Sequence, residues 1–322
     1  MPIERTVIGS FPPFSQPYSP ENVIKAITNI VDLQLRYGID VITDGEQRGS
    51  MIEYFEQIPG LERTKKGLKI VGKIKPMDNP DSFYKISDYR YVKSYLTSQG
   101  KENVKIKITI TGPVTLCFSS AMEDLVSTKK YYKDLRNPEI YSDFSEVLSS
   151  LARRAIDIGA YLQIDEPGLS GGFIQPELGK EILNRFFSSL PKSAIAEGKV
   201  SMHVCGSISS RLYSQLLGLD MGILSLGFSG KEESANIDVI SRKSLEDNHK
   251  KLGAGFISNK VVEDEKTALE RLKQIAQIVG PENIAYVHPT CGFRSTSPEL
   301  VEPILKNMKI ASDDFIKSLF QV

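Results

Sequence analysis

The chain of 322 residues contains little cysteine and little histidine, and it has no excess of charge of either sign. Lys and Arg together number 40, and so do Asp and Glu, which argues against a nucleic-acid-binding protein because such proteins carry a basic excess. The three cysteines, Cys117, Cys205 and Cys291, are too few for a disulfide framework, so we expect reduced thiols. With only three histidines, a metal-dependent hydrolase that needs several of them is also disfavoured.

Long apolar runs are absent as well. No segment approaches the roughly 20 apolar residues that are needed to span a membrane. The N-terminus lacks the apolar stretch of a secretory signal peptide. We therefore expect a cytoplasmic protein that does not associate with membranes.

Short β-rich runs alternate with longer segments of helical period. Eight such runs can be counted: Thr6–Phe11, Asp40–Glu46, Lys105–Pro113, Tyr161–Pro167, Lys199–Gly206, Ile223–Ser229, Lys251–Ser258 and Ile284–Gly292. Apolar residues recur at helical spacing in Pro20–Tyr37, Glu139–Gly159 and Glu265–Val279. Strand–helix alternation of this kind predicts a parallel sheet, and eight units predict a closed (β/α)8 TIM barrel. A doubly wound open sheet is the alternative.

One interval breaks this rhythm. The stretch from Arg48 to Asn103 is too long for one crossover helix, and Gly67–Pro76 alternates apolar and basic residues like the arm of a hairpin. We interpret roughly residues 56–103 as an insertion between strands two and three that caps the barrel mouth. The whole chain, residues 1–322, is then a single barrel domain, since α/β barrels of about 250 residues form one unit.

Reactive residue types cluster at the ends of the predicted strands. The active site of an α/β barrel forms at these ends. Ser10 closes the first run, Glu46 the second, Asp165 and Glu166 the fourth, and His203 and Cys205 the fifth, while Cys291 closes the eighth. Their shared position predicts one polar site at one end of the barrel.

His203, Cys205 and Cys291 form a candidate metal centre. Residues i and i+2 of a strand point to the same side, so His203 and Cys205 can face one ion. Two thiols and one imidazole can hold a zinc ion with a coordination position left open. The alternative is a satisfied core histidine and buried free cysteines, and that alternative is the better description of Cys117 in its apolar context.

The carboxylates at the strand ends suggest the ligand. Only one of Asp165 and Glu166 can point into the mouth, and the other can cap the following loop. Inward carboxylates opposite a zinc site suit an amino acid that carries a thiol. The zinc would bind the sulfur, the inward carboxylates the ammonium, and backbone N–H groups near Ser10 the carboxylate.

Six segments resemble, in this order, the catalytic domain of cobalamin-independent methionine synthase. They are Ile8–Pro12, Asp44–Glu46 followed by Met51–Phe55, Thr111–Thr115, Gln163–Pro167, His203–Cys205 and Pro289–Gly292. The resemblance covers nearly the whole chain and is to the short, single-barrel form found in archaea. It implies a methyltransferase that makes L-methionine from L-homocysteine.

The resemblance also implies roles for individual residues. His203, Cys205 and Cys291 would be ligands of Zn²⁺. Glu46 and Asp165 would be the catalytic residues and would bind homocysteine together with Ser10, with Ile8 and Gly9 supplying backbone contacts. Zinc would lower the pKa of the bound thiol, and the thiolate would attack a methyl group carried by a pterin or a corrinoid. A corrinoid or accessory protein could deliver that donor.

The chain departs from the family pattern at one metal position. The family's fourth zinc ligand is a Glu at the end of the sixth strand, where this chain has Gly227. Water, Glu232 or Glu233 could fill the position. The departure leaves a second hypothesis open, a paralogue that has lost catalysis and binds a small thiol or a partner protein.

Overall fold

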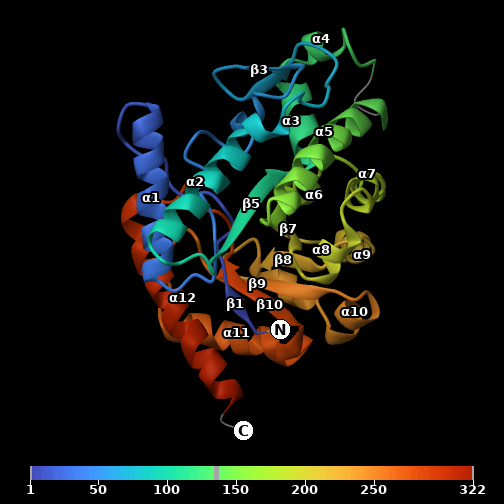
Figure 1. Ribbon diagram of the computed structural model, residues 1–322. Helices are drawn as coiled ribbons and strands as arrows, with labels where there is room; N and C mark the ends of the chain where they lie inside the picture. The colour runs from blue at the N-terminus through green and yellow to red at the C-terminus, as the bar shows by residue number, and fades with distance from the viewer. Residues whose placement is uncertain (1, 134–137, 321–322) are drawn as a thin grey trace.

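The computed structural model describes residues 2–133 and 138–320, and in these residues eight parallel strands form one sheet (Figure 1). The strands lie in the order β1-β10-β9-β8-β7-β6-β5-β2. Their bounds are β1 Glu4–Arg5, β2 Val41–Ile42, β5 Lys105–Thr111, β6 Tyr161–Asp165, β7 Val200–Val204, β8 Ile223–Gly227, β9 Lys251–Ile257 and β10 Ile284–Pro289. A parallel bridge between Thr6 and Val41 joins the two end strands and closes the barrel. The TIM-barrel prediction is confirmed, and the open-sheet alternative is wrong.

The first two strands are shorter than the sequence suggested. Beyond β1 and β2 the backbone leaves the ladder, and Gly45 and Glu46 take φ angles of +77° and +55°. Side chains replace the missing ladder bonds, since Thr43 Oγ1 donates to the Gly9 carbonyl at 2.8 Å. These two segments therefore end in loops that carry site residues.

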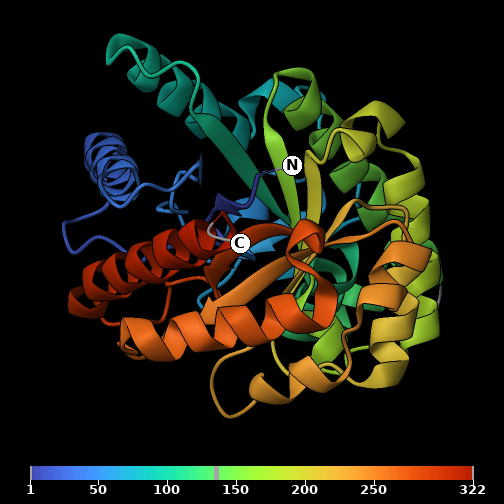
Figure 2. The ribbon, with the colours of Figure 1, turned by 90° about the horizontal axis from the view of Figure 1, so that it is seen from below.

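Twelve α-helices lie in the described part of the chain, and seen from below they surround the strands (Figure 2). Their bounds are α1 Pro20–Arg36, α2 Tyr84–Ser98, α3 Pro113–Glu123, α4 Leu125–Thr128, α5 Pro138–Asp157, α6 Pro167–Ser170, α7 Pro176–Ser188, α8 Lys192–Ala196, α9 Ser210–Leu217, α10 Arg242–Asp247, α11 Glu265–Val279 and α12 Pro298–Leu319. The three helices expected from periodicity are α1, α5 and α11. A side chain at the N-cap can fix where a helix begins. Ser19 does so for α1, because its hydroxyl accepts a hydrogen bond from the Asn22 N–H at 3.1 Å.

Strand β5 alternates between an apolar and a polar face. In β5 the residues Ile106, Ile108 and Ile110 belong to the main hydrophobic core, whereas Lys107 reaches across the barrel to the Val7 carbonyl and to Gln163. Because side chains on a strand alternate, every second residue of β5 faces the barrel axis. The interior of this barrel is therefore largely polar, in contrast to the branched apolar layers that are usual there.

The segment between β2 and β5 contains η1 Glu53–Phe55, the hairpin strands β3 Leu61–Arg63 and β4 Leu68–Ile70, η2 Pro80–Ser82 and α2. The predicted hairpin is present, and β4 packs beside α3 and α4 at the top of Figure 1. Helix α2 packs against β5 and α1 and thereby takes the place of a barrel helix. The insertion limits of 56–103 and the single-domain range stay predictions, and the latter includes residues 1, 134–137 and 321–322, which lie outside the described residues.

In the described ranges, no helix is long and apolar enough to cross a membrane.

Candidate active site at the carboxyl ends of the strands

Strand β7 and the segment after β10 bring His203, Cys205 and Cys291 together. One ligand atom from each lies within 4.8 Å of the others, and in the described part of the chain this is the one group of three or more His, Cys, Asp or Glu side chains arranged to hold a metal ion. Both ring nitrogens of His203 are buried without a hydrogen-bond partner, which is rare for buried polar atoms. One imidazole and two thiols at this separation fit a zinc ion in number and chemical type. The structure brings the predicted ligands together, and their binding of a metal stays a prediction.

Glu233 occupies the space that a side chain at position 227 would fill. Gly227 ends β8, and a Cβ atom built on it would lie 2.5 Å from the carboxyl carbon of Glu233. The Gly206 N–H donates to Glu233 Oε1 at 2.7 Å, which holds this carboxylate beside Cys205. Burial raises the pKa of Glu233, although the Gly206 N–H and His203 act in the opposite direction. Glu232, the neighbouring candidate, is exposed.

A cavity of about 210 Å³ adjoins the three metal-site residues. All the residues that the sequence analysis assigned to homocysteine line it. The lining comprises Ile8, Gly9, Ser10, Glu46, Ser50, Met51, Asp165, Pro167, His203, Cys205, Cys291, Gly292, Arg294 and Ser295. The cavity therefore has a sulfur-rich wall, two carboxylates and one guanidinium around a space of the size of a small amino acid.

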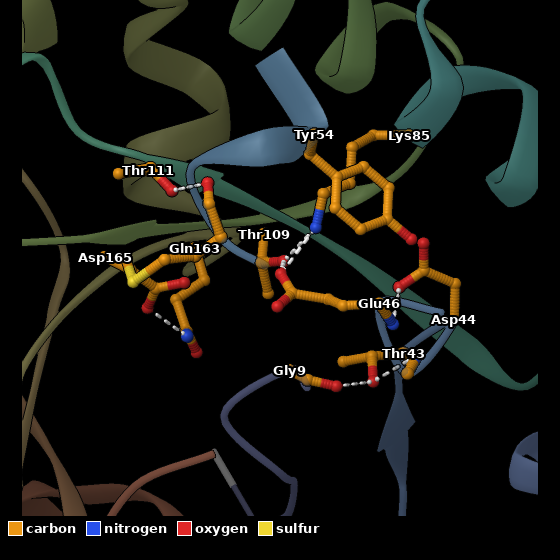
Figure 3. Close-up of polar contacts among 12 residues, drawn as sticks. Gly9, Thr43, Asp44, Glu46, Tyr54, Lys85, Thr109, Thr111, Gln163 and Asp165 are labelled. Atoms are coloured by element: carbon orange, nitrogen blue, oxygen red, sulfur yellow. Dashed lines mark hydrogen bonds and ion pairs between the residues drawn. The ribbon is translucent and has the colours of Figure 1, made fainter. Parts of the chain in front are cut away.

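Hydrogen bonds to the backbone and to one carboxylate oxygen hold Glu46 at this cavity (Figure 3). Lys85 Nζ and Thr109 Oγ1 both donate to its Oε1 atom, and Lys85 also donates to Thr109 at 2.9 Å. Its backbone N–H donates to Asp44 Oδ1 at 3.1 Å, which supports the left-handed conformation that few non-glycine residues adopt. Lys85 lies 4.1 Å from the centre of the Tyr54 ring. The other carboxylate oxygen has no hydrogen-bond partner among the described residues.

The ion pair with Lys85 keeps Glu46 charged in a buried site. Burial by itself would raise the pKa of Glu46, but the charge and hydrogen bond of Lys85, with the Thr109 hydroxyl, bring it below its usual value. Burial would likewise lower the pKa of Lys85, and Glu46 and Asp44 raise it instead. Both partners are therefore ionised at neutral pH.

Asp165 is connected to a second buried lysine through Gln163. Gln163 Nε2 donates to Asp165 Oδ1 at 2.6 Å, and Lys107 Nζ donates to Gln163 Oε1 at 2.6 Å. Burial raises the pKa of Asp165 to about 6, although His203 lowers it, and burial lowers the pKa of Lys107 to about 7. The cavity therefore faces a second carboxylate, which a cationic ligand would help to ionise.

Glu166 has the capping role that the sequence analysis left open for one of the two acids. Its Oε1 accepts from the Val114 N–H and its Oε2 from the Thr115 N–H, both at 2.9 Å. These N–H groups belong to the first turn of α3 and have no partner inside the helix. Burial raises the pKa of Glu166 to about 7. Glu166 does not line the cavity, and Asp165 does.

The backbone near the first strand is already partly engaged. The Ile8 carbonyl accepts from Gln163 Nε2 and the Gly9 carbonyl from Thr43 Oγ1, both at 2.8 Å. A Cβ atom on Gly9 would lie 2.9 Å from the Thr109 methyl group, so glycine permits the close approach of this loop to β5. The backbone here is positioned as a cavity wall.

Sequence reasoning missed three charged residues of the site: Lys85, Lys107 and Arg294. The alternating pattern of β5 carries a signal for Lys107, because Lys107 shares the inward face with Thr109. Lys85 and Arg294 lie on a helix and in a loop, where no such pattern marks them. His288 is buried with its ring centre 6.0 Å from that of His203, and burial lowers its pKa to about 3, so it stays neutral.

The fold and the site together define a barrel enzyme whose polar centre lies at the carboxyl ends of the strands. Residues 5–314 match the family model described as the catalytic domain of cobalamin-independent synthase. The chain therefore belongs to this family, and the resemblance seen in the sequence is confirmed.

Relatives of similar length support this assignment. The chain is 31% identical to a methionine synthase of Methanothermobacter marburgensis, in an alignment that covers 96% of this chain and 99% of the relative. It is 27% identical to a methionine synthase of Methanocaldococcus jannaschii, with 94% and 96% covered. The likeness thus extends over the full length of both relatives.

Solved structures show the same fold. A B12-independent methionine synthase from a Shewanella species, in complex with selenomethionine, superimposes with a TM-score of 0.75 at 18% identity and covers 99% of both chains. A protein described as a putative vitamin-B12-independent methionine synthase from Listeria monocytogenes gives a TM-score of 0.72 at 19% identity, with 99% of this chain and 98% of that chain covered.

The Lys85–Glu46 pair generates a stability prediction. Replacing Lys85 by Met leaves a buried carboxylate without its cation, and we expect the free energy of unfolding to fall by about 3 kcal/mol, the cost of breaking a buried pair. The double variant Lys85→Met/Glu46→Gln should recover much of this loss, because no buried charge remains. Urea unfolding measures all the variants.

Lys273→Met is the matched control. Lys273 pairs with Glu270 on the surface, where an ion pair contributes about 0.5 kcal/mol or less. Equal losses in Lys85→Met and Lys273→Met, or strictly additive losses in the double variant, would contradict the role of the buried pair.

Proposed function

We propose that this protein transfers a methyl group to the thiol of L-homocysteine to form L-methionine, and that a zinc ion held by His203, Cys205 and Cys291 activates this thiol. The observation that carries the proposal is the cavity that places these three residues opposite Glu46 and Asp165. Membership of a family whose relatives are methionine synthases supports homocysteine methylation. The reduced thiols that the site requires fit a cytoplasmic protein.

The chemistry follows from the cavity walls. Bound zinc would supply a positive charge that favours the thiolate form of the substrate sulfur at neutral pH. Glu46 and Asp165 bind the ammonium group, since both carboxylates face the cavity and Glu46 keeps one oxygen free. Ser10 lies at the same cavity and contributes to the carboxylate site. The residues thereby fix the substrate with its sulfur toward the metal.

We further propose that Glu233 is the fourth protein ligand. Its carboxylate lies in the space that a glutamate at position 227 would enter, beside Cys205. A ligand supplied by the loop after β8 would replace one supplied by the strand itself. This arrangement argues against the second hypothesis, a paralogue without a working metal site, which rests on Gly227.

The methyl donor approaches from an open cleft that adjoins the cavity. The cleft has a volume of about 670 Å³ and shares Cys205, Cys291 and Gly292 with the cavity. It has room for a methylated pterin, whereas a methylated corrinoid would have to present its methyl group at the mouth of the cleft, with a corrinoid or accessory protein as a candidate carrier. We propose these two donor classes as alternatives.

Metal analysis tests the zinc centre. The purified protein should bind about one zinc ion per chain, as expected for a single cluster of three or four ligands. Cys205→Ser and Cys291→Ser should each lose most of this zinc, measured by elemental analysis after dialysis. Cys117→Ser is the matched control and should retain it, because Cys117 is buried in the apolar core away from the cluster. A protein that takes up no zinc on titration would rule out the proposal.

Zinc affinity tests the fourth ligand. Glu233→Gln should weaken zinc binding at least roughly tenfold, the scale of effects seen even for groups that only support ligands. Gly227→Glu combined with Glu233→Ala should restore affinity, since removal of the Glu233 side chain clears the space that the new carboxylate then enters. The matched control is Glu232→Gln, which should leave affinity unchanged. If Glu232→Gln binds zinc more weakly than Glu233→Gln does, Glu233 is not the ligand.

A methyl-transfer assay tests the reaction itself. Methylcobalamin and methylated pterins are offered side by side with homocysteine, and methionine is measured by mass spectrometry. We expect methionine from at least one donor class. Asp165→Asn should lower kcat/KM for homocysteine roughly tenfold to a hundredfold, the effect of removing one charged hydrogen bond. The surface variant Glu62→Gln should retain wild-type activity, and the absence of methionine with every donor would refute the function.

A further inference from the structure

We infer that Arg294 binds the α-carboxylate of the amino-acid substrate and so selects amino acids over simple thiols, an inference that rests on the proposed function. The sequence motifs do not include Arg294, and none of the roles proposed above belongs to it. It lies three residues after Cys291 and lines the same cavity as Ser10, Glu46 and Asp165.

The segment that carries Arg294 runs directly along Ser10. The Phe293 N–H donates to the Ser10 carbonyl at 2.7 Å. A Cβ atom on Gly292 would lie 2.4 Å from Ser10 Oγ, so a side chain at position 292 would displace this hydroxyl. The segment Gly292–Phe293 therefore lies beside Ser10, and Ser10 and Arg294 both line the cavity, so a hydroxyl and a guanidinium are available there for one anion.

Most N–H groups of the Arg294 guanidinium are available to bind a ligand. Its Nη1 atom donates to the Glu46 carbonyl at 3.1 Å, which anchors the side chain at the cavity wall. Across the described residues Arg294 makes no ion pair with a carboxylate, whereas the buried Lys85 and the half-buried Arg48 both do. A guanidinium presents five N–H donors in a planar fork that matches a carboxylate. The Glu46 carboxylate acts on Arg294 only through space, so this partly buried guanidinium can still receive a carboxylate from a ligand.

The charges around the cavity are arranged for an α-amino acid that carries a thiol. Glu46 and Asp165 are negative and suit the ammonium group, and the metal-site residues suit the sulfur. Arg294 is the one lysine or arginine in the cavity lining and suits the carboxylate. Three separate contacts fix the orientation of a substrate whose three polar groups differ in charge.

Arg294 could instead act only as a brace for Glu46, whose backbone is in the left-handed region. The two roles make different predictions. A brace supports ammonium recognition, so its loss weakens every ligand that carries the amine. A carboxylate site affects only ligands that carry the carboxylate.

The experiment compares homocysteine with 3-aminopropane-1-thiol, which has the same thiol and amine but no carboxylate. Binding to the zinc-loaded full chain is measured by calorimetry. For Arg294→Gln we expect the Kd of homocysteine to rise roughly tenfold to a hundredfold, the range for one hydrogen bond to a charged group, while the Kd of the amine changes less than about threefold. Arg294→Lys should give an intermediate loss for homocysteine, because it keeps the charge but not the fork.

Arg211→Gln is the matched control. Arg211 is paired with Glu177 on the exposed face of α9, and its replacement should change neither Kd. Melting temperatures verify that each variant is folded, and Arg294→Lys alone carries the comparison if Arg294→Gln does not fold. Equal weakening of both ligands assigns Arg294 to bracing and overturns the inference, although homocysteine methylation by the wild type stands. A wild-type protein that binds no homocysteine overturns both proposals.

Discussion

The buried ion pair between Lys85 and Glu46 is the interaction on which the site depends. Lys85 comes from helix α2, Glu46 from the loop after β2 and Thr109 from β5, so this contact ties three segments together at one point. A buried charge is tolerated only when it is paired and hydrogen-bonded. The pair meets this condition for Glu46 and leaves its second oxygen toward the cavity, at the cost of a left-handed backbone.

Buried polar side chains continue from this ion pair through the barrel interior toward the amino ends of the strands. At the amino ends of the strands a small apolar cluster of Val41, Ile223, Ala285 and Tyr286 closes the barrel. Above it lie Lys107 and Gln163, and above these the residues of the cavity. Hydrogen bonds connect these inner polar groups in series: Lys107 donates to Gln163, and Gln163 donates to Asp165. A layered network of this kind fixes side-chain positions more narrowly than apolar packing does.

The exchange that we propose, of a strand ligand for the loop residue Glu233, has a simple steric basis. Glycine at position 227 leaves a gap at the end of β8, and the carboxylate of Glu233 lies in that gap while the Gly206 N–H holds it. A side chain at position 227 would collide with Glu233, so the carboxylate can lie here only because residue 227 is glycine. The proposed ligand and the glycine therefore form one unit, and the methyl-transfer function that we propose does not need the glutamate of the family pattern.

The sequence by itself determined the barrel, through eight apolar runs and the helices between them, and it placed His203, Cys205, Cys291, Glu46 and Asp165 at one end, because parallel strands share the direction of their carboxyl ends. It could not choose between Asp165 and Glu166, since that choice depends on which carboxylate meets the free N–H groups of α3. It also could not find Lys85, Arg294 or the position of Glu233. Only the tertiary structure decided these, because the partner of a buried charge is set by contacts between residues far apart in the chain, which no local pattern records.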